Sequence, residues 1–220
     1  SRRDVLEGEL LLLQDLEVRL SGPGRDAAPL SLDFPDTFAI GPVTVRIQTI
    51  QVERSRVVYR DASRGLLVDA QGLRLKARPE RRGIAFDLHL DALALQAPDV
   101  RETIADVEGA GWIHQDLLSI RAAAGRWQER RIRATGDIRR PFAAAELDLS
   151  IEGEADLAAL SRRFASPWPL AGVMTAKVTV QGPLDAVQVS GQLAVPRLTA
   201  GPIRARDVAV RGRWKEGLLD

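Results

Sequence analysis

Apolar and polar side chains alternate over most of the chain, and the apolar ones repeatedly fall on one side. Between positions 174 and 180 the apolar positions are Met174, Ala176, Val178 and Val180. Threonine or lysine fills each position between them. Because successive side chains of a β-strand point to opposite faces, this spacing predicts a strand with one buried and one solvated face. The pattern restarts after Gly182-Pro183 and after Gly201-Pro202, so it predicts a succession of strands joined by turns.

Turn signals recur at intervals of roughly 8 to 15 residues, which is the rhythm of an all-β protein rather than of alternating strands and helices. We therefore expect one all-β unit over residues 1–220, built as a long, curved, mainly antiparallel sheet. The apolar row changes phase at Gln48-Thr49 and at Asp91-Ala92, which requires an extra residue in the strand or a tight bend. Repeated changes of this kind bend and twist a sheet.

Two further sets of residues are assigned to the inner face. The first two apolar rows are expected at Leu10, Leu12, Leu16, Val18 and Leu20, and then at Leu30, Leu32 and Phe34. Small inner side chains are expected at Ala122, Ala124, Ala134, Ala176 and Ala205. Small residues leave room for a guest molecule, although a narrow sandwich also accommodates them.

Residues Asp156 to Phe164 break the alternation. Leu157, Leu160 and Phe164 recur at helical spacing, which predicts a short amphipathic helix that ends before Pro167. A helix of about nine residues is roughly 14 Å long and covers only a few strands. Because exposed apolar patches above a few hundred Å² are rare on soluble monomers, the sheet has to fold toward itself. A closed sandwich, a barrel and an open folded groove all meet this demand.

The composition of the chain argues against several classes of binding partner and site. Its 31 basic and 30 acidic residues give a net charge of +1, so no overall field recruits nucleic acid or an anionic membrane. The chain has no cysteine, which excludes disulfides and thiolate metal sites. The longest aliphatic run, Leu10 to Leu13, is far shorter than the roughly 20 residues of a membrane-spanning helix. The first residue is Ser1, so we expect the chain to be a piece of a longer protein.

Motifs for catalysis or metal binding are sparse. Asp87, His89 and Asp91 share one face of a strand at a spacing that could supply metal ligands, but a solvated outer face gives the same pattern. No G-x-S-x-G motif occurs, and Gly109-Ala110-Gly111 is expected in a turn. The aromatic content of 5% argues against a transmembrane barrel, which carries aromatic girdles. We therefore expect no catalytic residue, no metal and no cofactor.

The C-terminal third carries a family resemblance. The helix D-L-A-A-L-S-R-R-F (156–164) precedes P-L-A-G-V-M-T-A-K-V-T-V-Q-G-P-L-D-A-V-Q-V-S-G-Q-L-A-V (169–195) and V-A-V-R-G-R-W (208–214). This order of a small helix and glycine-punctuated strands resembles the TamB branch of the AsmA-like, bridge-like lipid transfer proteins. The pattern I-x-x-I-x-V-x-x-S-x-V-x-Y-x-D (47–61) is similar to a strand pair of that family. The turn at Pro183 departs from the family, which often carries the proline a few residues later.

The resemblance implies a taco-like sheet with an apolar lumen, in a protein anchored in the inner membrane and crossing the periplasm of a diderm bacterium. It implies a non-enzymatic activity, the movement of phospholipids between the inner and outer membranes. The alternative is assistance in assembling or secreting outer-membrane β-barrel proteins with an Omp85-type partner, bound through parts outside this chain. An enzyme on a β-solenoid that uses the face of Asp87, His89 and Asp91 also stays open.

No catalytic residue follows from the resemblance, and the residues of interest are those that would line the groove against phospholipid acyl chains. They are Val43, Val45, Ile47, Ile84, Phe86, Leu88, Leu90, Val178, Val180, Val187, Val189, Leu193, Val195, Val208 and Val210.

Overall fold

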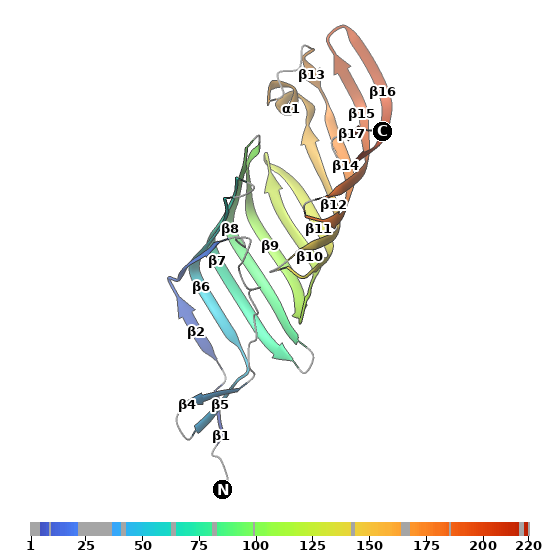
Figure 1. Cartoon of the computed structure of the whole chain (residues 1–220). Coiled ribbons are helices and arrows are strands. Elements are labelled where there is room, and N and C mark those ends of the chain that lie inside the picture. Colours follow the sequence, from blue (N-terminus) through green and yellow to red (C-terminus); the bar gives the residue numbers. More distant parts are fainter. Residues whose placement is uncertain are drawn as a thin grey trace.

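In a computed structural model, the described residues of the chain form two β-sheets and one short helix (Figure 1). The structure describes residues 5–8, 10–21, 37–40, 43–62, 65–80, 83–98, 100–141, 144–163, 168–184, 186–215 and 218–219. The long strands are β6 (Ile50–Asp61), β7 (Leu66–Glu80), β8 (Gly83–Ala97), β9 (Val100–His114), β10 (Leu117–Trp127), β11 (Arg130–Arg139), β12 (Glu146–Asp156), β14 (Val173–Pro183), β15 (Gln188–Ala200) and β16 (Ile203–Lys215). The short strands are β1 (Val5–Gly8), β2 (Leu11–Gln14), β3 (Glu17–Ser21), β4 (Thr37–Ile40), β5 (Val43–Ile47), β13 (Leu170–Ala171) and β17 (Leu218–Leu219). The all-β prediction is confirmed.

The order of strands in the large sheet follows the order of the chain. From β6 to β16 each long strand pairs antiparallel with the next long strand, and the helix and β13 are inserted between β12 and β14. At the other end β2 and β3 both run parallel to β6. The strands β1, β5 and β4 form a separate three-stranded sheet. The sheet is therefore mainly antiparallel, as expected, with one parallel margin.

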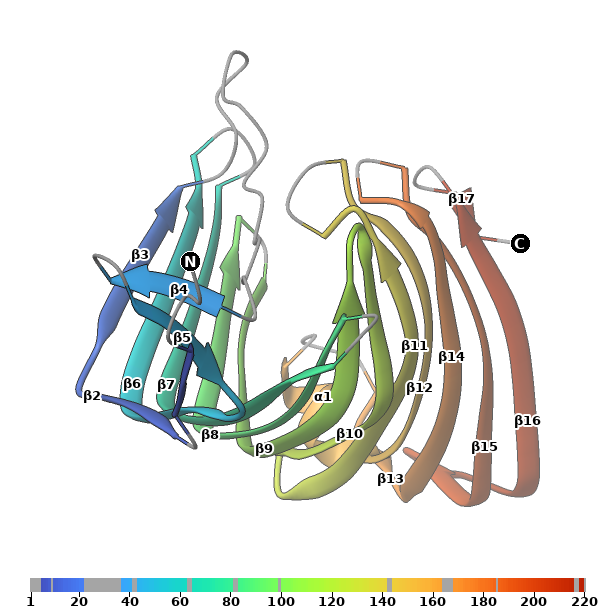
Figure 2. The same cartoon turned by 90° about the horizontal axis from the view of Figure 1, so that it is seen from below.

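The large sheet is open and curved. Figure 1 shows its strands following one another from β2 to β16 along the length of the molecule, and Figure 2 shows the same strands bowed in a view from below. The sheet does not close into a barrel, because its path of paired strands begins at β2 and ends at β17. Of the three architectures that the pattern left open, the folded open sheet is the observed one.

The predicted helix is present as α1 (Leu157–Arg163), and Phe164 lies outside the described residues. Asp156 caps it, because its Oδ1 accepts hydrogen bonds from the backbone N–H of Ala158 at 2.7 Å and of Ala159 at 3.4 Å. Leu157 is 8% exposed, and Val195 on β15 is 7% exposed. The helix contacts β12 and β13, so it covers only one end of the sheet.

A line of backbone irregularities crosses the N-terminal half of the large sheet. Asp15, Arg54, Gly72 and Asp106 have positive φ angles of 55°, 49°, 65° and 47°. Asp91 lies beside this line, because a Cβ on Gly72 would overlap its carboxylate. The phase change predicted at Asp91-Ala92 belongs to this line, whereas the change at Gln48-Thr49 is a bend between strands of different sheets.

These irregularities explain where the predicted inner residues were wrong. Leu11 and Leu13 pair with Ile50 and Val52, and Leu10 and Leu12 are 54% and 45% exposed, because the chain gains a residue at Asp15. The register of β10 shifts after Ile120, so Ala123 pairs with Ala134.

That shift places Ala122 and Ala124 on the opposite face from the one expected. Gly109-Ala110-Gly111 was also wrong as a turn, because these residues lie within β9. The expected row of Leu30, Leu32 and Phe34 lies outside the described residues.

Candidate functional site, the apolar face of the large sheet

One face of the large sheet is apolar from its first strand to its last. Directly paired residues on neighbouring strands lie on the same face, so the register traces rows across the sheet. One row consists of Leu13, Val52, Leu75, Leu88, Gly109, Ala123, Ala134, Ile151, Val178, Gly191 and Gly212. A second consists of Leu11, Ile50, Ala77, Phe86, Gly111, Ile120, Gly136, Leu149, Val180, Val189 and Trp214. Neither row contains a polar side chain.

Most of the residues expected in a groove lie on this apolar face. Ile84, Phe86, Leu88 and Leu90 come from β8. Val178 and Val180 come from β14, Val189, Leu193 and Val195 from β15, and Val208 and Val210 from β16. Val187 immediately precedes β15, two residues before Val189.

The other three expected residues, Val43, Val45 and Ile47, lie in β5. This strand belongs to the three-stranded sheet and not to the large one. Their side chains lie outside the described part of the structure.

Part of the apolar face is buried. Ile50, Ala77, Phe86 and Leu90, on β6, β7 and β8, are each 7% exposed. In the described part of the chain the helix contacts β12 and β13, so it does not cover these residues. Phe86 packs against the next strand at Gly111, so neighbouring strands of the same sheet contribute to this burial.

Glycines in the middle of the sheet let side chains from the next strand lie flat on the backbone. A Cβ on Gly111 would lie 2.6 Å from Cζ of Phe86, and one on Gly109 would lie 3.2 Å from Cγ of Leu88. A Cβ on Gly153 would meet Cγ2 of Ile132 at 2.7 Å. Over β9 to β12, where glycine and alanine predominate, the side chains of both apolar rows therefore project only a short distance from the backbone.

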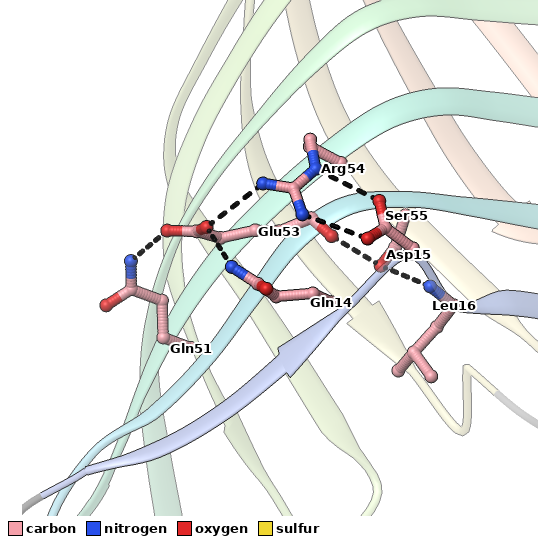
Figure 3. A network of polar contacts seen from close by, with 7 residues as sticks. All are labelled: Gln14, Asp15, Leu16, Gln51, Glu53, Arg54 and Ser55. Carbon is pink, nitrogen blue, oxygen red and sulfur yellow. Dashed lines mark hydrogen bonds and ion pairs between the residues drawn. The ribbon is translucent and has the colours of Figure 1, made fainter.

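The polar atoms that interrupt the apolar face have partners. Ser55 is 2% exposed; its Oγ donates to the carbonyl of Glu53 at 2.9 Å and accepts from the backbone N–H of Leu16 at 3.1 Å (Figure 3). At the far end of β10, Nε1 of Trp127 donates to Oε2 of Glu102 at 2.8 Å. The Ser55 hydroxyl and the Trp127 N–H therefore both have hydrogen-bond partners within the protein.

The opposite face carries cross-strand ion pairs. Figure 3 shows Arg54 holding Asp15 through two hydrogen bonds of 3.0 and 2.9 Å. This guanidinium holds the pKa of Asp15 below its ordinary value. The pKa of Asp69 is lowered in the same way by two hydrogen bonds of 2.8 Å from Arg56, with a further one from Gln71. Each pair lies across two strands, so the charges select the strand register.

The candidate metal ligands lie on this charged face. Arg78 binds Asp87 at 2.6 Å, Arg74 binds Asp91 at 2.6 Å, and Nε2 of His89 lies 3.5 Å from Oδ1 of Asp91. Among the described residues no group of three or more His, Cys, Asp or Glu side chains could hold a metal ion. The arginines therefore account for the two carboxylates as members of ion pairs.

Comparison with protein-family models, with curated proteins and with solved structures gives no match. In the described ranges no helix has the length and apolar character needed to cross a membrane.

Sequence reasoning missed part of the apolar face. Leu11, Leu13 and Ala123 belong to the two rows, but Leu11 and Ala123 have leucine or alanine on both sides in the sequence and Leu13 follows Leu12. The face of these residues could have been found only from the requirement that each of them pair with an apolar residue on the next strand, as Leu13 does with Val52.

Proposed function

We propose that the apolar face is a track for phospholipid acyl chains, and that the chain is a segment of a periplasm-spanning protein of the TamB and AsmA-like kind. The single observation that carries this proposal is the pair of uninterrupted apolar rows that run across the whole sheet. A packed core would be covered by a second layer, but a conduit has to leave its apolar surface accessible to a ligand.

The energetics of a lipid in water favour such a track. Exposing an acyl chain of about 15 methylenes to water is unfavourable by roughly 12 kcal/mol, at about 0.8 kcal/mol for each methylene. A lipid therefore crosses an aqueous gap only along continuous apolar surface. Because the hydrophobic effect has no preferred direction, a surface of valine, leucine, glycine and alanine holds a chain without fixing it at one point.

The shape of the sheet supports the same proposal. The rows run perpendicular to the strands, and so from one end of the stack of strands to the other (Figure 1). An acyl chain lying along a row would pass from strand to strand, with its head group at the open side of the curved sheet. Anchoring in the inner membrane, delivery to the outer membrane and binding of an Omp85-type barrel would use parts outside this chain.

A second candidate function rests on a different observation, the length of the edge strand β16. On its outer side only Trp214 and Lys215 pair with another described strand, β17. A long strand edge can accept an added strand through backbone hydrogen bonds. This property would suit a scaffold for assembling outer-membrane β-barrel proteins.

The test of the lipid track is site-specific photo-crosslinking in cells of a diderm bacterium. A photo-reactive residue replaces Val180 or Val189 on the apolar face, and Gln181 or Gln188 serves as the matched control. Each control is the chain neighbour of its test position and points to the opposite face. We expect phospholipid adducts at positions 180 and 189, and few at positions 181 and 188.

Absence of lipid at all four positions of folded protein would contradict the track. Equal labelling of the two faces would contradict it as well, because it would report chance contact with membranes. Protein adducts from nascent barrels at β16, without lipid on the apolar face, would favour the scaffold instead.

A further inference from the structure

The ion pairs of the polar face are not distributed evenly over the sheet. Arginines on β6, β7 and β10 are paired with aspartates, as in Arg54 with Asp15, Arg74 with Asp91 and Arg126 with Asp106. The last two long strands, β15 and β16, carry five exposed arginines that form no ion pair within the described part of the chain. These are Arg197, Arg204, Arg206, Arg211 and Arg213.

Two of these arginines line a hollow of about 470 Å³ that extends over β12, β14, β15 and β16. Its polar side chains are Ser150, Thr179, Ser190, Gln192, Lys177, Arg211 and Arg213. None of its lining residues is an aspartate or a glutamate. The hollow thus combines three hydroxyls with three cationic groups, and the carboxylate of Glu152 lies beside it, paired with Lys177.

The register of the strands produces this composition. Ser150 pairs directly with Thr179, Thr179 with Ser190, and Ser190 with Arg213. Because neighbouring strands are about 4.8 Å apart, the three hydroxyls form a row about 10 Å long. The neighbouring row contains Glu152, Lys177, Gln192 and Arg211. Short side chains therefore form the floor and longer side chains form the rim.

The donors in this hollow match a tetrahedral oxyanion. Guanidinium groups bind phosphate through paired hydrogen bonds, and each hydroxyl can donate one more. Lys177 contacts Glu152 at 2.7 Å through one of its three N–H groups, which leaves two N–H groups for a ligand. A carboxylate offers only two oxygens, whereas a phosphate monoester offers three strong acceptor oxygens to this set of donors.

We propose that this hollow on the polar face of β12, β14, β15 and β16 binds the phosphate group of a phosphate ester. The site lies on the opposite face from the acyl-chain track and does not depend on it. The shared chemistry is the phosphate, which a soluble ester or a lipid head group can provide.

The test measures binding of inorganic phosphate to the whole chain by isothermal titration calorimetry. The test variant is the double substitution Arg211→Gln/Arg213→Gln, and the control is Arg204→Gln/Arg206→Gln. The control removes the same charge from the same strand outside the hollow. We expect the affinity of the test variant for phosphate to fall at least about tenfold, because it loses two charge-assisted donors. We expect the affinity of the control to change less than about twofold.

A third variant distinguishes a specific binding site from general electrostatic attraction of phosphate to the arginines. Thr179→Val keeps every charge and the shape of the side chain but removes one hydroxyl of the floor. A severalfold weakening of phosphate binding is expected, with the urea unfolding midpoint checked for each variant. Absence of saturable phosphate binding, or equal weakening in the two double variants, would overturn the proposal.

Vesicles distinguish the two sources of the phosphate. Vesicles of phosphatidylcholine with phosphatidic acid, whose head group is a phosphate monoester, are sedimented with the protein, with and without free phosphate. Sedimentation that phosphate reverses, and that requires Arg211 and Arg213, assigns the site to a lipid head group. Phosphate binding without sedimentation assigns it to a soluble ester.

Discussion

At the scale of single residues, glycines shape the apolar face because they carry no side chain. Phe86 and Leu88 lie over Gly111 and Gly109 on the next strand, where a side chain would block them. A glycine in a strand interior is normally unfavourable because it packs nothing and loses more backbone freedom on folding. Here the cross-strand side chain occupies the space instead, and the surface over β9 stays low.

Gly111 and Gly109 are expected to differ in their tolerance of alanine. A Cβ on Gly111 would lie 2.2 Å from the carbonyl oxygen of Ser119, so Gly111→Ala forces the backbone to move. We expect a loss of about 1 to 3 kcal/mol in the free energy of unfolding, the range found for overpacked interiors. Gly109→Ala, which meets only the flexible end of Leu88, is the control. Equal urea midpoints for the two variants would contradict this packing.

The Arg56–Asp69 pair predicts a pH dependence. Hydrogen bonds from Arg56 hold the pKa of Asp69 below its ordinary value of 3.8, so the folded state binds fewer protons than the unfolded state in acid. Its contribution to stability is present at neutral pH and is lost as the pH falls through about 4 and below. Since Arg56 is 49% exposed and solvent screens the pair, the contribution is small.

The measurement compares urea unfolding of the parent and Asp69→Asn from pH 7 to pH 3. The difference between the two proteins should shrink as the pH falls. Asp116→Asn, which removes the same charge from a turn, controls for net charge. A difference that grows in acid would have the wrong sign for this ion pair.

At the scale of elements, the line of irregularities through Asp15, Arg54, Gly72 and Asp106 keeps one face apolar while the strands bend. Each extra residue would move the following side chains of a regular strand to the other face, but its positive φ turns the backbone and returns them to the same face. The extra residues on neighbouring strands match one another, and Val52 and Val57 both stay on the apolar face.

Deletion of Arg54 tests this explanation. Removing one residue leaves Val52 and Val57 on one face by simple alternation, but β6 then lacks the extra residue that matches those at Asp15 and Gly72 on its neighbours. We expect the unfolding free energy to fall by about 2 to 3 kcal/mol, because two or three hydrogen bonds between the strands beside the deletion lose their partners, at about 1 kcal/mol for each. Arg54→Gly keeps the residue count and suits the φ of 49°, so its urea midpoint should stay near that of the parent. A deletion as mild as the glycine variant would refute the match between strands.

Several of these irregularities could not be predicted from the sequence. In β8, β12, β14 and β15 most apolar residues have polar neighbours in the sequence, so the alternation identified which residues face the apolar side. Around Leu10 to Leu13 and Ala122 to Ala124, neighbouring residues are equally apolar, and a change of phase leaves no trace in the sequence. The parallel pairing of β2 with β6 joins residues 39 positions apart, such as Leu11 and Ile50, and no local pattern encodes it.

At the scale of the whole molecule, the two faces separate two kinds of interaction. A charge on the apolar face should block a lipid track, whereas the same charge on the polar face should not. Leu193→Asp and its neighbour Ala194→Asp provide this pair on β15. We expect lipid crosslinking at position 180 to fall at least about tenfold in Leu193→Asp, since an ion on the track costs several kcal/mol to desolvate. Ala194→Asp should retain it, and equal loss in both would argue against a track on one face.

The agreement between chain order and strand order has a mechanical consequence. From β6 to β16 each long strand pairs with the long strands next to it in the chain, and only short strands add further pairings among the described residues. Stability is therefore close to a sum of hairpin terms and nearest-neighbour couplings. Tension applied to the two ends would unzip the sheet one hairpin at a time and would not break it in one step. A chain of this kind changes its reach by gaining or losing hairpins, without redesign of the strands that remain.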